Sequence, residues 1–247
     1  MRLQLMTWPE VENYLERSKG LIVPIGSTEQ HGPTGVIGTD AICAETLAWR
    51  AGKLADAMVG PTLTVGMSEH HMHFPGSVTL RPTTLVAVVR DVILSLARHG
   101  FRRLFFVNGH GGNTASIDAA FFEAYAEAPQ LPGGGDDLRC LNGEWWATPS
   151  AKELSVELFG DKDGDHASAS EVSIASAAYP GHLKIADLDP EVPPSTHVFG
   201  PADFRRRYPE GRMGSHPELA SVEAGERIIE AVAKDLAEEY RVFLTEE

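Results

Sequence analysis

The sequence predicts an α/β protein whose central sheet is mainly parallel and is covered by helices on both faces. Two observations support this fold class. Residues 21–25 (LIVPI) and 104–107 (LFFV) are short, fully apolar runs, the pattern of strands that are buried on both sides. Each run is followed, after a glycine-rich loop, by an apolar-periodic segment of helical length. Strands that alternate with helices form βαβ units, and such units build parallel sheets between helical layers.

The expected elements follow the chain in this alternation. A first helix begins after Thr7, which can cap it, because Pro9 suits its first turn and Glu10 completes a capping box. The other expected helices are 40–56, 82–98, 114–127 and 218–243, and the other expected strands are 62–65 and 138–141. Residues 188–217 are Pro-rich and weakly periodic, which indicates a long excursion or an intersubunit arm, with the arginines at 205–207 in a solvated loop. Residues 1–247 are interpreted as one domain.

Composition excludes several classes of partner. The chain has 247 residues, of which 43% are hydrophobic, as in an ordinary globular protein. Its formal charge of −14 argues against nucleic-acid binding, which needs clustered Lys and Arg. The sequence has no apolar run of ~18 residues and no signal-peptide pattern, so no membrane partner is expected. Cys43 and Cys140 lack pairing or CxxC spacing, which fits a reducing compartment, and we expect a cytoplasmic protein.

Metal-type side chains follow the first predicted strand, at the edge where open parallel sheets bind their ligands. In the loop GSTEQHGP at 26–33, Glu29 and His31 point to the same side if the loop is extended. Asp40 stands at a predicted helix start, where a carboxylate can cap the helix and still offer an oxygen to a cation. Taken alone, an aspartate in this position is more often only a cap.

Two further loops carry the same kinds of side chain. His110 lies in NGHGGN at 108–113, where three glycines let the backbone bring the imidazole to the sheet edge. His166 and Glu171 lie in GDHASASE at 164–171, separated mainly by small residues. A tight turn with a surface histidine would explain one such loop, but three of them together indicate a metal site. These ligands suit zinc, manganese or iron rather than calcium, and two ions about 3.5–4 Å apart could share one carboxylate.

The same loops carry a resemblance to the creatininase family, creatinine amidohydrolase and its relatives. The matching segments are PIGSTEQHGP followed by Asp40, EHHMHFPGSVTL at 69–80, NGHGGN, HASASEVS at 166–173 and GSHPELASVEAG at 214–225. They stand in family order and span most of the chain. The resemblance implies a three-layer αβα sandwich and two divalent ions per subunit, with Zn²⁺ expected first and Mn²⁺ or Fe²⁺ as alternatives. It also implies a homo-oligomer, usually a hexamer.

Single residues take roles from this resemblance. It implies metal ligands at Glu29, His31, Asp40 and His110, with Asp40 bridging the two ions, and a proton shuttle at His166. These assignments hold only for positions that match the family motifs. They predict that distant loops converge on one pair of cations.

The chain departs from the family pattern in two places. Creatininase itself has a bulky residue and a glutamate after the histidine of its NGH segment, where this chain has Gly111 and Gly112. Glu171 is therefore our candidate for the missing metal-binding carboxylate. Relatives with the glycine-rich loop read HAGE at the next motif, where this chain has Ser168 and Ala169. This second difference argues against carrying over the role of that glutamate, and with it a closely similar substrate.

The expected reaction is hydrolysis of a non-peptide C–N bond, in a small cyclic amide or formamide, by a hydroxide bound to two metal ions. His166 would protonate the leaving nitrogen. His70, Ser68 and Gly111 are expected to contact the substrate. Two alternatives stay open: a peptidase-like member that trims a modified peptide, and a non-catalytic, metal-stabilised assembly.

Two aromatic clusters have more ordinary explanations. Among His70, His71 and His73 stand the apolar Met72 and Phe74, which suggests a loop that packs over the site and in which one histidine could contact substrate sooner than metal. Trp145 and Trp146 follow a predicted strand and are expected in the core or in an interface. Neither cluster is predicted to bind an ion.

Overall fold

A computed structural model describes residues 1–246 of the chain. Its sheet contains three parallel strands in the order β1 (Gly20–Ile25), β2 (Arg103–Asn108) and β3 (Arg139–Glu144). The register places Ile25 opposite Asn108, and Asn108 opposite Glu144, so all three strands end at the same edge. The predicted α/β fold with a parallel sheet is confirmed.

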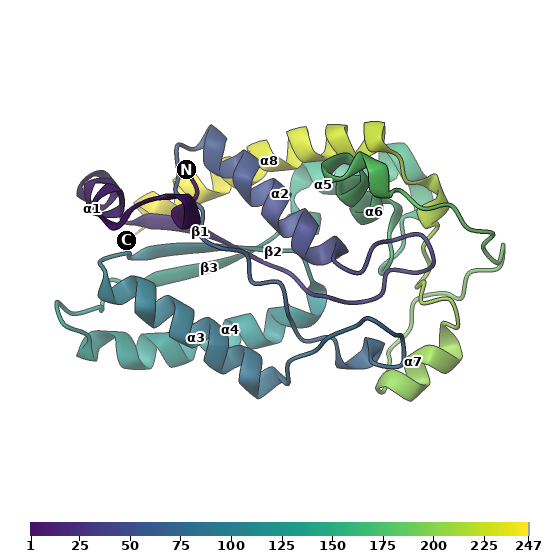
Figure 1. Cartoon of the computed structure of the whole chain (residues 1–247), viewed down its shortest axis with the longest axis horizontal. Coiled ribbons are helices and arrows are strands. Elements are labelled where there is room, and N and C mark those ends of the chain that lie inside the picture. Colours follow the sequence, from purple (N-terminus) through teal and green to yellow (C-terminus); the bar gives the residue numbers. More distant parts are fainter. Residues whose placement is uncertain (247) are drawn as a thin grey trace.

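Helices cover both faces of this sheet (Figure 1). Their bounds are α1 (Trp8–Arg17), α2 (Thr39–Leu54), α3 (Pro82–Arg98), α4 (Thr114–Glu127), α5 (Pro149–Phe159), α6 (Ala169–Ala178), α7 (Pro201–Arg207) and α8 (Val222–Thr245). Helices α2 and α8, with α5 and α6, lie over one face, while α3 and α4 lie over the other. No helix among residues 1–246 is long and apolar enough to cross a membrane.

Two apolar cores explain the uninterrupted hydrophobic strands. Ile22 and Phe105 point into the core formed with α2 and α8. Their chain neighbours Val23 and Phe106 point into the core formed with α3 and α4, because successive side chains of a strand face opposite sides. Each such fully buried side chain contributes about 1.5–3 kcal/mol relative to an exposed one. The central positions of β1 and β2, which are buried on both faces, therefore carry apolar residues without a polar alternate.

The expected strand at residues 62–65 is wrong. This segment meets β1 only through the single bridge between Ile25 and Leu63, and Val59, shortly before it, forms another single bridge with Ile22. Pro24 accepts a hydrogen bond from the Leu63 amide, yet it has no N–H to return, and Pro61 likewise lacks a donor. The two prolines interrupt the ladder that a regular strand requires.

The excursion after α6 is largely irregular, but its arginine cluster is not a loop as expected. The three arginines form the last turn of α7, where basic side chains favour the negative end of the helix. Arg207 also pairs with Asp203 one turn earlier. Helix α7 lies at the end of the molecule where the three strands end (Figure 1), so the excursion returns over that edge.

Candidate metal centre

The close approach of α2 to the ends of β1 and β2 builds the floor of the candidate site. A side chain at Gly26 would clash with the backbone of Ala41, and one at Gly109 would clash with the carbonyl of Asp40. Glycine is therefore needed at both strand ends to let the first turn of α2 reach them. This contact brings Asp40 next to the loops that follow the two strands.

Asp40 faces two imidazoles with its two carboxylate oxygens. Oδ1 accepts a hydrogen bond from His31 Nε2 at 2.9 Å, and Oδ2 lies 3.2 Å from His110 Nδ1. The expectation that Asp40 caps α2 is wrong, because Gly38 occupies the cap position and no side chain caps it. Asp40 falls inside the first turn, so its carboxylate is directed to the histidines.

Glu29 is fully buried and surrounded by imidazoles. Its Oε2 lies 3.2 Å from His110 Nε2, and its Oε1 lies 3.1 Å from His71 Nε2 and 3.6 Å from His166 Nδ1. Burial alone would raise the pKa of Glu29, but the charge of His110, with the neighbouring His71 ring, outweighs it and holds this pKa well below its ordinary value. The carboxylate is therefore held as an anion.

Glu171 joins the cluster from the start of α6. Its Oε1 accepts a hydrogen bond from the Ser168 amide at 2.6 Å and closes a capping box, while Oε2 lies 3.8 Å from His31 Nε2. Burial, only partly offset by the charge of His31, raises the pKa of Glu171 to about 7. Burial would lower the pKa of His31, but the charges of Asp40 and Glu171 raise it to about 10.

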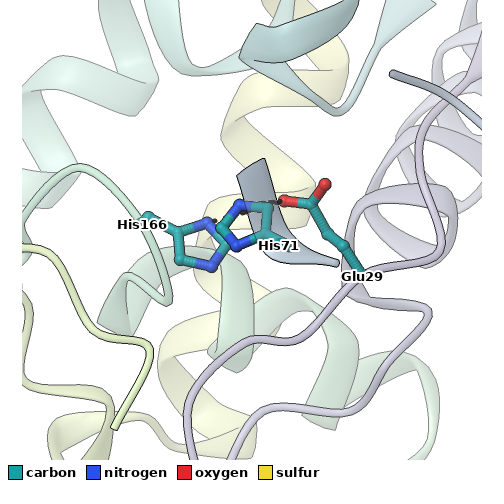
Figure 2. Close-up of side chains that lie close together, drawn as sticks. All are labelled: Glu29, His71 and His166. Carbon is teal, nitrogen blue, oxygen red and sulfur yellow. Dashed lines mark ion pairs between the residues drawn. The ribbon is translucent and has the colours of Figure 1, made fainter. Parts of the chain in front are cut away.

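His71 and His166 stand against each other beside Glu29, as Figure 2 shows. Their rings stack with centroids 4.2 Å apart, and the Phe204 ring of α7 meets His71 edge-on at 4.5 Å. The sequence predicted the placement of His166 near the site but missed His71 within the cluster. A single 3₁₀ turn at Glu69–His71 turns this ring inward, and nothing in the spacing of the histidines reveals which of them it selects.

A cavity of about 340 Å³ opens onto this cluster. Its wall includes Gly111, Trp146, His166 and Glu171. Trp145 also lines it, although most of this side chain is buried in the core, and Trp146, which was expected in the core or an interface, is only partly buried there. Of the three residues expected to contact substrate, Gly111 lines the cavity, whereas Ser68 and His70 are not part of its wall.

Ser68 and His70 lie behind the cluster. Ser68 is fully buried, and its hydroxyl hydrogen-bonds that of Ser27. The ring of His70 is parallel to that of His110 at 6.2 Å and lies 4.1 Å from that of His71. Burial, with the neighbouring His71 ring, lowers the pKa of His70 to about 4. Both residues are therefore placed to support the cluster rather than to line the cavity.

The cluster fits a divalent cation. Several of its buried polar atoms have no hydrogen-bond partner among the described residues: both oxygens of Glu29, Oδ2 of Asp40 and Nε2 of His71. Three sets of residues each offer ligand atoms within 4.8 Å of one another: Glu29 with His31 and Asp40, His31 with His166 and Glu171, and Glu29 with His71 and His166. Burying an unpaired carboxylate is costly, and a cation would satisfy these oxygens.

A parallel α/β fold with buried imidazoles and carboxylates at the carboxyl ends of its strands defines a candidate metal-dependent enzyme. The family model described as creatinine amidohydrolase matches residues 4–240, and the chain belongs to the creatininase family. It is accordingly a hydrolase that acts on carbon–nitrogen bonds.

Relatives and solved structures agree with this membership. The chain is 30% identical to creatinine amidohydrolase of Pseudomonas putida, over 96% of this chain and 94% of that protein. It is 39% identical to the mycofactocin precursor peptide peptidase of Mycolicibacterium smegmatis, over 40% of this chain and 42% of that one. A structure named as manganese creatininase superposes with a TM-score of 0.87 at 28% identity, over 99% of this chain and 99% of that one. A Zn-Zn type structure of a mutant creatininase superposes with a TM-score of 0.86 at 28% identity, over 99% of this chain and 98% of that one. The family fold is thus confirmed.

Proposed function

We propose that this hydrolase uses two divalent ions to cleave the C–N bond of a small cyclic amide or formamide. The observation that carries the proposal is Asp40, whose two oxygens face different imidazoles, as those of a carboxylate shared by two ions can. Zinc is expected first, with manganese or iron as alternatives. Solved relatives titled with manganese and with two zinc ions support this choice.

We assign three donors to each ion. His31, Asp40 Oδ1 and Glu171 would hold one, and Glu29, Asp40 Oδ2 and His110 the other. Gly112 cannot supply a carboxylate, and a Cβ there would lie 2.7 Å from the Met67 carbonyl and would clash with the His110 ring. The sixth donor must therefore come from another element, which supports Glu171.

The residues of the chain suit the chemistry of amide hydrolysis. Bound divalent ions lower the pKa of water from ~15.7 toward ~7 and polarise a carbonyl oxygen. His166 lines the cavity and directs Nδ1 toward Glu29, so it is placed to pass a proton to the leaving nitrogen. A positioned acid–base group of this kind contributes roughly 10²–10⁴-fold to the rate.

The size of the cavity favours a small substrate. Its volume of about 340 Å³ is at the lower end of the ~300–1,000 Å³ found for small-molecule sites. Gly111 and Trp146 would form the apolar side of the binding site, with the metal cluster opposite. A second candidate is trimming of a modified peptide, which the 39% identity to a mycofactocin precursor peptidase over 106 residues supports.

Metal analysis joined to a substrate panel tests the proposal. We expect two ions per chain and hydrolysis of a cyclic amide or formamide, both lost in Asp40→Ala. Asp118→Ala, which changes an exposed aspartate of α4, is the control and should keep both. Full metal content and turnover in Asp40→Ala would overturn the proposal. Cleavage of peptides alone would favour the peptidase, and no hydrolysis with little metal would favour a non-catalytic assembly.

A further inference from the structure

The side chain of Gln30 lies among groups from three separate segments. Gln30 stands between Glu29 and His31, and it is buried. Its Nε2 lies 3.0 Å from His71 Nδ1 and 2.8 Å from His166 Nε2. Glu29 and His31, the candidate ligands beside it, would hold cations, while the Gln30 side chain contacts His71 and His166, which have no assigned ligand role.

Two backbone groups fix the orientation of the Gln30 amide. Its Oε1 accepts a hydrogen bond from the Gly32 N–H at 2.9 Å, and its Nε2 donates one to the Gly211 carbonyl at 3.0 Å. A backbone N–H can only donate and a carbonyl can only accept, so the amide cannot be reversed. One hydrogen on Nε2 is thereby used, and one remains.

Only one of the two imidazoles can accept this remaining hydrogen. His166 Nε2 also lies 2.8 Å from the backbone carbonyl of Gln30, which can only accept. Nε2 of His166 must therefore carry a hydrogen and donate it to that carbonyl. The amide hydrogen of Gln30 then goes to Nδ1 of His71. No other assignment satisfies all of these buried groups.

We propose that Gln30 is a positioning residue that sets the tautomers of His71 and His166. With Nδ1 occupied as an acceptor, His71 carries its hydrogen on Nε2, which lies 3.1 Å from Glu29 Oε1. His71 then orients Glu29 and is not itself a metal ligand. The Nδ1 of His166 then carries no hydrogen, and it lies 3.6 Å from Glu29 Oε1. A base needs such an unprotonated nitrogen to accept a proton on that side. The catalytic meaning of this arrangement rests on the proposed function.

A substitution at Gly211 should disturb the hydrogen bonds of the Gln30 amide without changing Gln30 itself. Its φ of +80° favours glycine, and a Cβ at this position would clash with the Gln30 amide. Gly211→Ala should therefore displace Gln30 without changing any titratable or metal-binding group. Gly133 has a similar φ of +86° but nothing within 4 Å of a built Cβ, so Gly133→Ala reproduces the backbone strain alone.

The test is a ¹H–¹⁵N correlation spectrum of the histidine rings in metal-free and zinc-loaded protein at neutral pH. We expect Nε2–H tautomers for both His71 and His166 in the unmodified chain. Gln30→Met removes the amide donor and should abolish the preference of His71. Gln30→Glu puts an acceptor in its place and should move the hydrogen of His71 to Nδ1. Unchanged His71 signals in both variants would overturn the inference.

Zinc affinity and turnover give a second readout. Loss of a group that orients a metal-site residue typically lowers metal affinity or activity about 10–100-fold. We expect this loss in Gln30→Met and in Gly211→Ala, but not in Gly133→Ala. If the Gln30 variants fail to fold, Gly211→Ala decides, because an unchanged tautomer and unchanged zinc affinity in that variant contradict the role of Gln30.

These outcomes separate the inference from the proposed function. The tautomers are read in metal-free protein and need no substrate. A chain with the expected tautomers but no amide hydrolysis would refute the proposed function and leave the Gln30 assignment standing. Amide hydrolysis by a chain whose His71 tautomer does not change in Gln30→Met would refute the Gln30 assignment alone.

Discussion

Single side chains in this site serve two purposes at once, and Glu171 is the clearest example. One of its oxygens closes the capping box of α6, while the other is directed to His31. The capping box therefore fixes the carboxylate in the direction that a metal ligand requires. A short link of this kind between local helix chemistry and the site shows how a residue from another loop could replace the carboxylate missing at Gly112.

Two substitutions at Glu171 should separate these purposes. Glu171→Gln keeps an oxygen for the capping box, so thermal unfolding should change little, while zinc affinity falls because the charge is lost. Glu171→Ala loses the cap as well and should cost about 1 kcal/mol more in stability. Calorimetric unfolding and zinc titration measure the two effects. Equal zinc affinity in Glu171→Gln and the unmodified chain would argue against the ligand role.

Residue chemistry also sets the limit of what sequence could predict. Glu29, His31, Asp40 and His110 were predicted together because carboxylate and imidazole after strand ends indicate a metal site, and the structure brings them together. Gln30 was missed because an amide has no metal-binding signature. Its importance arises from hydrogen-bond partners more than 40 residues away in the chain.

At the scale of elements, the strand ends and α2 form one unit. The glycines at the ends of β1 and β2 permit the contact with the first turn of α2 that presents Asp40. Long helices such as α3 and α4 were predictable because their apolar residues recur with helical spacing. Helix α6 was not, since its sequence ASEVSIASAA is almost wholly buried and has no polar face to create a period.

Gly109→Ala tests the contact between β2 and α2. The added methyl would clash with the Asp40 carbonyl, so we expect a loss of about 1–3 kcal/mol, as for overpacked cores, together with loss of bound zinc. Gly181→Ala is the control, because nothing lies within 4 Å of a built Cβ there. Urea unfolding and metal analysis give the result. Normal stability with full zinc content in Gly109→Ala would contradict this account.

At the scale of the whole molecule, the excursion after α6 closes over the edge that carries the site. Phe204 of α7 is fully buried and packs against His71 and His166 in a small cluster separate from the two cores. The sequence indicated an excursion here but not its packing, because its few apolar anchors follow no period. Contacts of this kind depend on the finished fold and leave no local pattern.

Phe204→Ala should loosen the excursion and leave the sheet intact. We expect faster proteolysis and hydrogen exchange within 188–217, with little change in the two main cores, because local units can open below the global unfolding free energy. Phe122→Ala, at an exposed site on α4, is the control. Uniform loss of protection throughout the chain would show that the excursion is not a separate unit.

The excursion also bears on the predicted assembly. Its large apolar side chains Ile185 and Phe199 are 96% and 77% exposed. If the predicted homo-oligomer uses this surface, light scattering should give a multiple of the chain mass, a hexamer by resemblance, and Ile185→Asp should reduce it. A monomer at working concentration would contradict the prediction. The cytoplasmic location likewise stays a prediction.

The most direct test of the whole account is anomalous X-ray diffraction from crystals grown with zinc. We predict two peaks about 3.5–4 Å apart on either side of Asp40, one beside His31 and Glu171 and the other beside Glu29 and His110. A single peak, or peaks remote from Asp40, would contradict the shared-carboxylate centre on which the proposed chemistry depends.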